Sequence, residues 1–307
     1  MGRTPGGSEP ALSGRPGKRL LQWDAIFTAM PDAGETTYQL ARGLALAAAG
    51  IVALALERWR PHERLRPAWG TNLGLWGVDT LVVAVVCGWV VAVWTAERGF
   101  GLLAYLGAGP LVAVAVGILG LDAVSYLWHR ANHQLPLLWR FHQVHHADTS
   151  FHVTTALRFH PGELLLALPV RLAAVIALGV PPEGVLLFEV VFGVANLLEH
   201  GNFDLPRSVE STAQRLFITP ALHRGHHASD WQELNTNFGT VFSAWDRLGR
   251  TFRRGDGERR VVTGLPDWDR SRAPSLWECL RLPVARRSAR SSFSPIRSSM
   301  ARGGTRH

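Results

Sequence analysis

The chain has 307 residues, enough for one or two domains, and a formal net charge of +8 that comes mainly from arginine. Its two cysteines, Cys87 and Cys279, lie far apart and the first is inside an apolar run, which argues against a disulfide framework and against cysteine metal ligands. Apolar residues gather in long runs, as in a membrane protein.

The N-terminal part is expected to be a disordered leader followed by two membrane helices. Met1–Arg19 is rich in Gly, Pro and Arg and has no apolar core of the signal-peptide kind. Leu44–Leu56 is an uncharged run and predicts a first helix, although it is short for a membrane span. Thr80–Trp94 predicts a second helix, which starts nearer Leu73 if the helix tolerates Asp79.

A third apolar run and an apolar hairpin follow. Leu111–Trp128 contains Asp122 as its only charged residue and leads directly into His129. Leu164–Val180 and Gly184–Leu198 are joined by two prolines and predict a helical hairpin. The hairpin arms carry Arg171 and Glu189, which predicts either that these two residues pair or that the hairpin enters only part of the bilayer.

Arginine in the loops orients the helices. The loop after the first helix contains four arginines, whereas the next loop contains only Arg98. Since short cytoplasmic loops are enriched in Lys and Arg, the first loop is expected in the cytoplasm, and the third helix then delivers His129 to the cytoplasmic surface. The hairpin returns to the same side at His200, so all histidine clusters are expected on one face.

Histidine spacing is the most informative pattern. An HxxxH pair at His129 and His133 precedes an HxxHH box at His142, His145 and His146, and a second HxxHH box follows at His223, His226 and His227. Residues three or four apart share a helix face, and neutral imidazole is a good ligand for iron, zinc or copper. The pattern therefore predicts a polyhistidine metal site, because burying so many unpartnered imidazoles would be costly.

Three segments are expected along the chain. Residues 1–37 are assigned to the disordered leader, 38–260 to the membrane-bound domain and 261–307 to a basic, largely disordered tail. Arg281–His307 has seven arginines and no acidic residue, which favours contact with anionic lipid headgroups over nucleic acid. The expected fold class is all-α: an integral membrane bundle of about four to five apolar helices with a cytoplasmic helical cap that holds the histidines.

The chain resembles the fatty acid hydroxylase and sterol desaturase superfamily of membrane-bound di-iron oxygenases. The resemblance rests on LDAVSYLWHRANH, LLWRFHQVHHAD, TTALRFHPGE, LLEHGNFD, LHRGHHASD and NTNFGTVFSAWDRLGRTF, in this order between about Leu121 and Phe252. It implies that the eight box histidines are metal ligands and nominates two more, His160 and His200. The family does not usually use the position of His152, and His62 and His307 are expected to be solvated.

Carboxylates near the boxes are candidates for orienting the ligand rings. Asp122 lies two helical turns before His129 and would accept a hydrogen bond from an imidazole, with helix capping or an arginine pair as the alternative. Glu163 is a second candidate of this kind, and Glu199 and Asp246 are weaker ones. Trp139, Trp231 and Trp245 are interpreted as interfacial or core aromatics.

The resemblance implies two iron ions, dioxygen as co-substrate and hydroxylation or desaturation of a membrane lipid. Electrons must come from an external donor, a ferredoxin or cytochrome with its reductase, because the sequence has no flavin, nicotinamide or haem motif. A membrane fatty acyl desaturase or a carotenoid hydroxylase or ketolase is the enzymatic alternative. The alternative of another class is a metal transporter or a structural zinc protein, with no HExxH motif to suggest a zinc protease.

Overall fold

The computed structural model describes residues 33–64, 66–94, 101–257, 259–266 and 272–285, and the described residues from Leu40 onward form one compact unit. In the described part the chain is helical and has no sheet, only three isolated β-bridges, so the all-α prediction is confirmed. The elements are α2 (Ala33–Trp59), α3 (Trp69–Trp94), α4 (Leu102–Tyr105), α5 (Pro110–Gln134), α6 (Pro136–His146), η1 (Val153–Leu157), α7 (Pro161–Leu178), α8 (Pro182–Glu199), α9 (Arg207–Ala213), α10 (Pro220–His226), α11 (Trp231–Leu234), α12 (Ala244–Leu248) and α13 (Leu276–Arg281).

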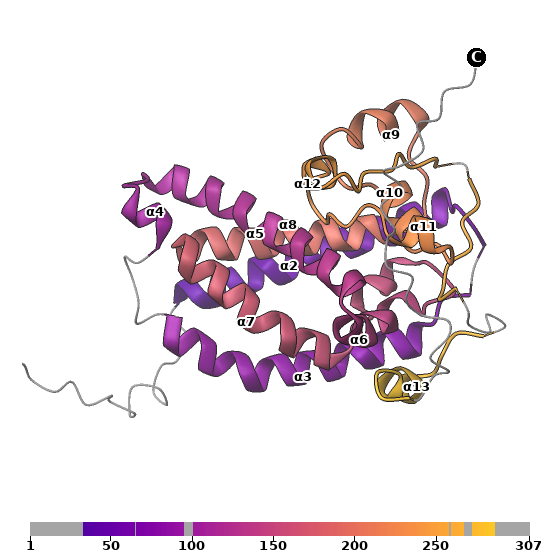
Figure 1. Ribbon diagram of the computed structural model, residues 1–307, viewed down its shortest axis with the longest axis horizontal. Helices are drawn as coiled ribbons and strands as arrows, with labels where there is room; N and C mark the ends of the chain where they lie inside the picture. The colour runs from indigo at the N-terminus through magenta and orange to yellow at the C-terminus, as the bar shows by residue number, and fades with distance from the viewer. Residues whose placement is uncertain (1–32, 65, 95–100, 258, 267–271, 286–307) are drawn as a thin grey trace, which may run out of the picture. The chain divides into compact units, whose positions relative to one another are not determined.

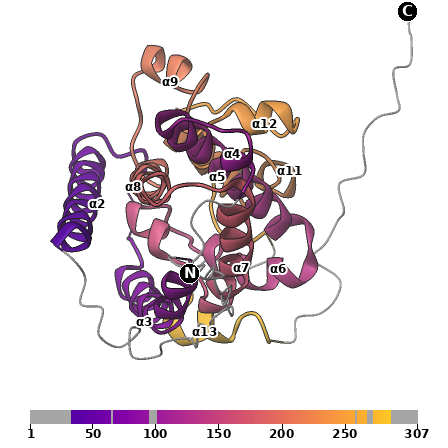
Figure 2. The same cartoon turned by 90° about the vertical axis from the view of Figure 1, so that its left-hand side faces the viewer.

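Long helices form the scaffold of the molecule. Within the described residues, three segments are long and apolar enough to cross a bilayer: Thr37–Trp59, Pro110–Gln134 and Pro161–Leu178. Helix α5 packs against both α7 and α8, and α3 packs against α7 (Figure 1). The short helices α10 and α12 contact α8 and α5, and they gather where those two helices end (Figures 1 and 2).

Proline marks where the helices begin. Pro110, Pro136, Pro161 and Pro182 occupy the first turns of α5, α6, α7 and α8, where a missing N–H costs nothing. Leu135, which precedes Pro136, is extended with φ −101° and ψ 119° because proline disfavours a helical residue before it. This one-residue break turns α6 back toward the end of α5.

Charged residues inside the apolar helices are partnered differently from the prediction. Glu189 of α8 pairs with Arg42 of α2 at 3.3 Å, not with Arg171 of the same hairpin. The Arg171 guanidinium lies instead over the rings of Phe192 and Phe188, at 5.1 and 5.9 Å from their centroids. Helices α2 and α8 lie close enough for Arg42 to reach Glu189, and the sequence of the hairpin alone does not reveal this contact.

The arginine-rich loop between α2 and α3 lies at the same end of the bundle as His200. Pro61 pairs with Phe203 in an antiparallel bridge, and His62 donates its backbone N–H to the Asn202 carbonyl at 3.1 Å. Both contacts tie the loop to the residues that follow α8. The loop and the histidines therefore share one side, as the orientation argument requires.

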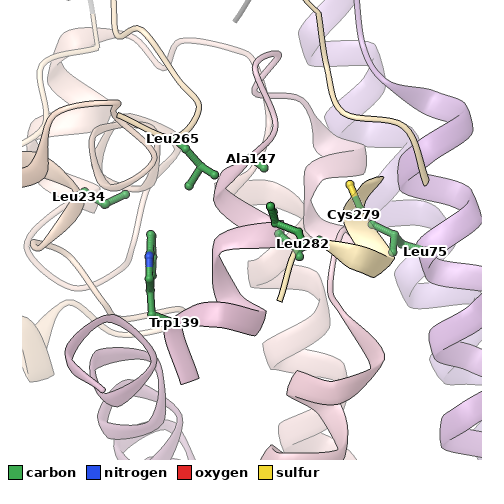
Figure 3. Packing of buried hydrophobic residues seen from close by; sticks show 8 residues of the cluster. Leu75, Trp139, Ala147, Leu234, Leu265, Cys279 and Leu282 are labelled. Atoms are coloured by element: carbon green, nitrogen blue, oxygen red, sulfur yellow. The ribbon is translucent and has the colours of Figure 1, made fainter. Parts of the chain in front are cut away.

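Part of the segment assigned to the disordered tail is ordered. Residues 272–285 include α13, whose Ser275 and Glu278 form a capping box. Cys279 and Leu282 are buried in a hydrophobic cluster with Leu75 of α3 and Trp139 of α6 (Figure 3). Burial of apolar side chains stabilises this part of the tail against the helices. Residues 1–32 of the predicted leader and residues 267–271 and 286–307 of the tail lie outside the described residues.

Candidate metal centre

The structure brings nine buried or half-buried histidines together in two groups. In each group one ring nitrogen per residue lies within 4.8 Å of the others. The first group is His129, His133, His142, His146 and His226, and the second group is His145, His200, His223 and His227. Four separate helices supply them, which agrees with a site assembled from distant boxes.

Each HxxHH box contributes to both groups. On α6, His142 and His146 are four residues apart and share a face that joins the first group, while His145 points to the second. On α10 and its C-cap the assignment is reversed, because His223 and His227 join the second group and the residue between them, His226, joins the first. The two boxes thus lie side by side with their roles exchanged.

Hydrogen bonds on the outer side fix the orientation of five rings. The Nδ1 atoms of these histidines lie 2.7 to 3.2 Å from an acceptor oxygen. Four of the acceptors are backbone carbonyls, which only accept, so Nδ1 carries the proton and Nε2 is left with a lone pair. The pairs are His129 with Phe238, His145 with Arg158, His200 with Asn196 and His226 with Thr236, and the fifth ring, His142, meets the Glu163 carboxylate.

The Nε2 atoms face one another across the interior of the two groups. His226 lies 3.0 Å from His129 and His223 lies 3.0 Å from His200, both measured between Nε2 atoms. Two lone pairs do not hydrogen-bond, so a ring held through Nδ1–H gains nothing from this proximity unless a cation lies between the nitrogens. Both ring nitrogens of His133 and Nε2 of His227 are buried without a hydrogen-bond partner in the described part of the chain.

Burial keeps six histidines of the two groups neutral. It lowers the pKa of His145, His146, His223 and His227 well below the ordinary range, and neighbouring imidazoles add to the effect. The pKa values of His200 and His226 fall to about 3 for the same main reason, burial. Neutral imidazole is the form that ligates a metal, so the residues present fit a metal centre.

Glu163 occupies the position expected of a carboxylate that orients a ligand ring. Its Oε1 accepts from Nδ1 of His142 at 2.8 Å and from the amide of Asn132 at 3.0 Å. Glu163 is in the first turn of α7 and only 5% exposed. Asn132 is part of this network and gives no signal in the sequence, since a single Asn on a helix has many other uses.

The other carboxylates play different parts. Asp122 does not accept from an imidazole: among the described residues its Oδ2 accepts from the Trp245 indole at 2.7 Å and the Phe242 N–H at 3.2 Å. This corrects the expectation for Asp122, which holds the α12 segment instead, and it gives Trp245 a partner. The carboxylate oxygens of Glu199 come no closer than 3.9 Å to Nδ1 of His200 and 3.8 Å to that of His223.

Asp246 supports the site through the backbone. Its two carboxylate oxygens accept from the N–H groups of Phe238 and Gly239, both at 2.8 Å, and from the Thr251 hydroxyl at 2.6 Å. Because the Phe238 carbonyl accepts from His129, Asp246 fixes the peptide segment that orients this ring.

Among the described residues, three histidines lie outside both groups. His160 caps α7: its Nδ1 accepts from the Gly162 N–H at 2.9 Å and its Nε2 lies 3.2 Å from the Leu280 carbonyl. Both nitrogens are therefore engaged, and His160 is not placed as a ligand, in contrast to the expectation. His152 pairs with Glu57 at 2.7 Å, and His62, expected to be solvated, is buried against Asp204 at 2.9 Å.

Arg158 is a further residue that the sequence did not single out. It is fully buried, and its carbonyl accepts from His145. Its guanidinium donates to the Val144 carbonyl and to the Asn72 side chain, both at 2.8 Å. The motif position of Arg158, two residues before His160, gives no hint of these contacts because they involve α3 and α6.

A cavity of about 160 Å³ opens beside the two groups, between α5, α7 and α8. His129, His142 and His145 line it at one end. Much of the remaining lining is apolar, including Leu164, Val170 and Phe192. A chain of methylene groups would thus reach the histidines through an apolar passage.

Comparisons with known proteins agree with this geometry. The family model "Fatty acid hydroxylase" matches residues 114–251. Among curated proteins, an ornithine lipid hydroxylase of Rhizobium tropici is 33% identical over 45% of this chain and 41% of its own length. Cholesterol 25-hydroxylase of Rattus norvegicus is 28% identical over 49% of this chain and 50% of its own length. Alkylglycerol monooxygenase of Homo sapiens is 30% identical over 48% of this chain and 32% of its own length.

The chain spans half or less of the length of these relatives, and no solved structure matches it. The matched region includes both histidine groups and the carbonyls and carboxylates that orient them. The resemblance inferred from the histidine boxes is confirmed: residues 114–251 match the fatty acid hydroxylase family model, and the curated relatives are lipid hydroxylases and monooxygenases.

Proposed function

We propose that the protein is an integral membrane oxidoreductase that holds two iron ions and uses dioxygen to hydroxylate a C–H bond of a membrane lipid. The observation that carries this proposal is the two groups of buried imidazoles, whose Nε2 atoms converge while the Nδ1 atoms of five rings are held from behind. The family supports an oxygenase, and the relatives named above act on lipids.

Imidazole is a good ligand for iron, and the surrounding groups have separate roles. Bound iron would supply the redox chemistry with dioxygen, which no side chain provides. The carbonyls behind His129, His145, His200 and His226 hold the lone pairs in position. The apolar cavity excludes water and holds the lipid chain beside the histidines.

Electrons are proposed to come from an external carrier on the cytoplasmic side, where the arginine-rich loop and the histidines are expected. Arg250, Arg253 and Arg254 would attract an acidic carrier, and Arg253 is ion-paired with Glu233 at 3.3 Å. Long-range attraction predicts that reduction of the metal by an acidic carrier slows as salt rises. A rate independent of ionic strength would exclude this steering.

Metal analysis with matched variants tests the proposal. The purified protein should contain about two irons per chain, the number that a paired-metal site requires. His145→Ala and His226→Ala remove one ligand from each group and should lose iron and product together, whereas His160→Ala should keep both because His160 lies outside the groups. Iron retained in the first two variants would overturn the ligand assignment.

Product analysis separates the alternatives. A product heavier than the lipid by one oxygen atom identifies hydroxylation, and a product lighter by two hydrogen atoms identifies desaturation. Zinc in place of iron, with no oxygen consumption, would favour the structural or transport alternative and refute the oxygenase.

A further inference from the structure

The cavity beside the histidines has a charged residue in its wall away from them. Arg171 of α7 is exposed and belongs to the cavity lining, together with Phe192 of α8. An arginine within an apolar helix of membrane-spanning length is costly unless a partner or a polar passage compensates it. Arg171 is therefore a candidate for ligand binding, in a role that rests on the proposed function.

Helix α7 sets the distance between Arg171 and the histidines. Glu163, which holds His142, lies eight residues before Arg171 on this helix. At 1.5 Å per residue the two positions are about 12 Å apart along the helix axis. Leu164, Ala167 and Val170 line the cavity between them. One end of the passage thus offers nitrogen ligands and the other a cation, with an apolar wall between.

Charge at this level of the bundle is unbalanced. Among the described residues, no carboxylate lies within 4.0 Å of the Arg171 guanidinium, which packs on the rings of Phe192 and Phe188. The carboxylate that attracts it, Glu189, is bound to Arg42 at 3.3 Å. One carboxylate between two guanidinium groups leaves a net positive charge, which an anionic ligand would neutralise.

We propose that Arg171 binds the anionic group, a carboxylate or a phosphate, of an acyl-chain lipid. A guanidinium with free donors forms short, charge-assisted hydrogen bonds with either group. The acyl chain then lies along the apolar wall and brings a carbon about 12 Å away to the histidine groups. Arg171 is in this assignment a specificity-determining residue that selects acidic lipids and sets which carbon reaches the site.

Equilibrium binding to the detergent-solubilised full chain tests the assignment. The probes are a radiolabelled long-chain fatty acid, the fatty alcohol and the mono-acyl phosphate of the same chain length. The wild-type protein should bind at least one acidic probe about tenfold or more tightly than the alcohol, as expected for a charge-assisted hydrogen bond. The stronger acidic probe identifies a carboxylate or a phosphate as the ligand group.

Two variants make the test specific. Arg171→Gln should abolish the preference for acid over alcohol and leave binding of the alcohol within about twofold, since the apolar wall is unchanged. Glu189→Gln changes the same level of the bundle by one charge in the opposite sense and should keep the preference. A preference that persists in Arg171→Gln, that is lost equally in Glu189→Gln, or that is absent from the wild type overturns the assignment.

Oxidation products separate this assignment from the proposed function. If acidic lipids bind through Arg171 and no oxidised product forms with a reductant and oxygen, the oxygenase proposal fails and the binding site stands. If oxidised product forms equally from acid and alcohol in wild type and in Arg171→Gln, the oxygenase stands and the role of Arg171 fails.

Discussion

Replacing Glu163 tests whether a carboxylate behind His142 controls metal affinity. Glu163 accepts from His142 at 2.8 Å and from Asn132 at 3.0 Å, and all three residues are buried. In Glu163→Leu both donors lose their acceptor, which costs about 1–3 kcal/mol for each unsatisfied group. We therefore expect the variant to lose about 2–6 kcal/mol of unfolding free energy, a large part of the stability of a typical domain.

Metal affinity should fall as well. Loss of a hydrogen-bond partner behind a ligand imidazole typically weakens metal binding about 10–100-fold. Glu163→Gln, whose amide oxygen still accepts one hydrogen bond, should fall between wild type and Glu163→Leu. The assay equilibrates each folded, purified variant with chelators of graded affinity and measures the iron that remains on the protein.

Asp122→Asn is the matched control. Asp122 is also a buried carboxylate, but it accepts from Trp245 and Phe242 and not from an imidazole. It should lose stability and retain wild-type iron affinity. If Glu163→Leu holds iron as tightly as wild type, or if Asp122→Asn weakens iron equally, the carboxylate behind His142 does not control affinity and the reasoning is refuted.

Three further outcomes follow from the geometry. Asp246→Ala removes the acceptor of the Phe238 and Gly239 N–H groups and, at about 1–3 kcal/mol for each, should lower the unfolding free energy by about 2–6 kcal/mol in denaturant titration. Gly101→Val should reduce the yield of folded protein on size-exclusion chromatography, because φ is +114° and a Cβ would lie 2.4 Å from the Gly179 backbone. In chelator-stripped protein, the folded-state pKa of His200 and of His226, about 3, lies below the unfolded value near 6.5, so the unfolded state binds more protons. The unfolding free energy should therefore fall by about 1.4 kcal/mol per pH unit for each histidine as the pH drops from 6.5 toward 3. Melting temperatures that stay constant over this pH range would contradict the prediction.

Local sequence rules predicted the helices and the shared side of the histidines. Proline positions, apolar runs and spacing of three or four residues are local properties, so α5 and the α7–α8 hairpin agree with the expected segments, and α6 agrees with the expected helical cap that holds histidines. Helix α5 continues through His133, beyond the apolar run that predicted it, because the good helix formers Arg130, Ala131 and Gln134 follow the run.

The hydrogen-bond partners of the histidine rings come from distant parts of the chain, so the sequence did not predict them. Asp122 has the right helical spacing for His129, but the Nδ1 of that ring is taken by the Phe238 carbonyl, 109 residues later in the chain. The position of His160 had a local signal that the family resemblance overrode: a residue before Pro-Gly-Glu at a helix start is an N-cap, and its ring accepts from Gly162. Division of the histidines into two groups required the relative rotation of α6 and α10, which spacing alone does not define.

Because the HxxHH boxes exchange roles, the two histidine groups cannot move independently. Rotation or sliding of α6 or α10 would move histidines of both groups at once, because each of these helices contributes residues to both. Selection on either histidine group therefore acts on both, and a one-residue insertion in α10 would displace residues of both groups.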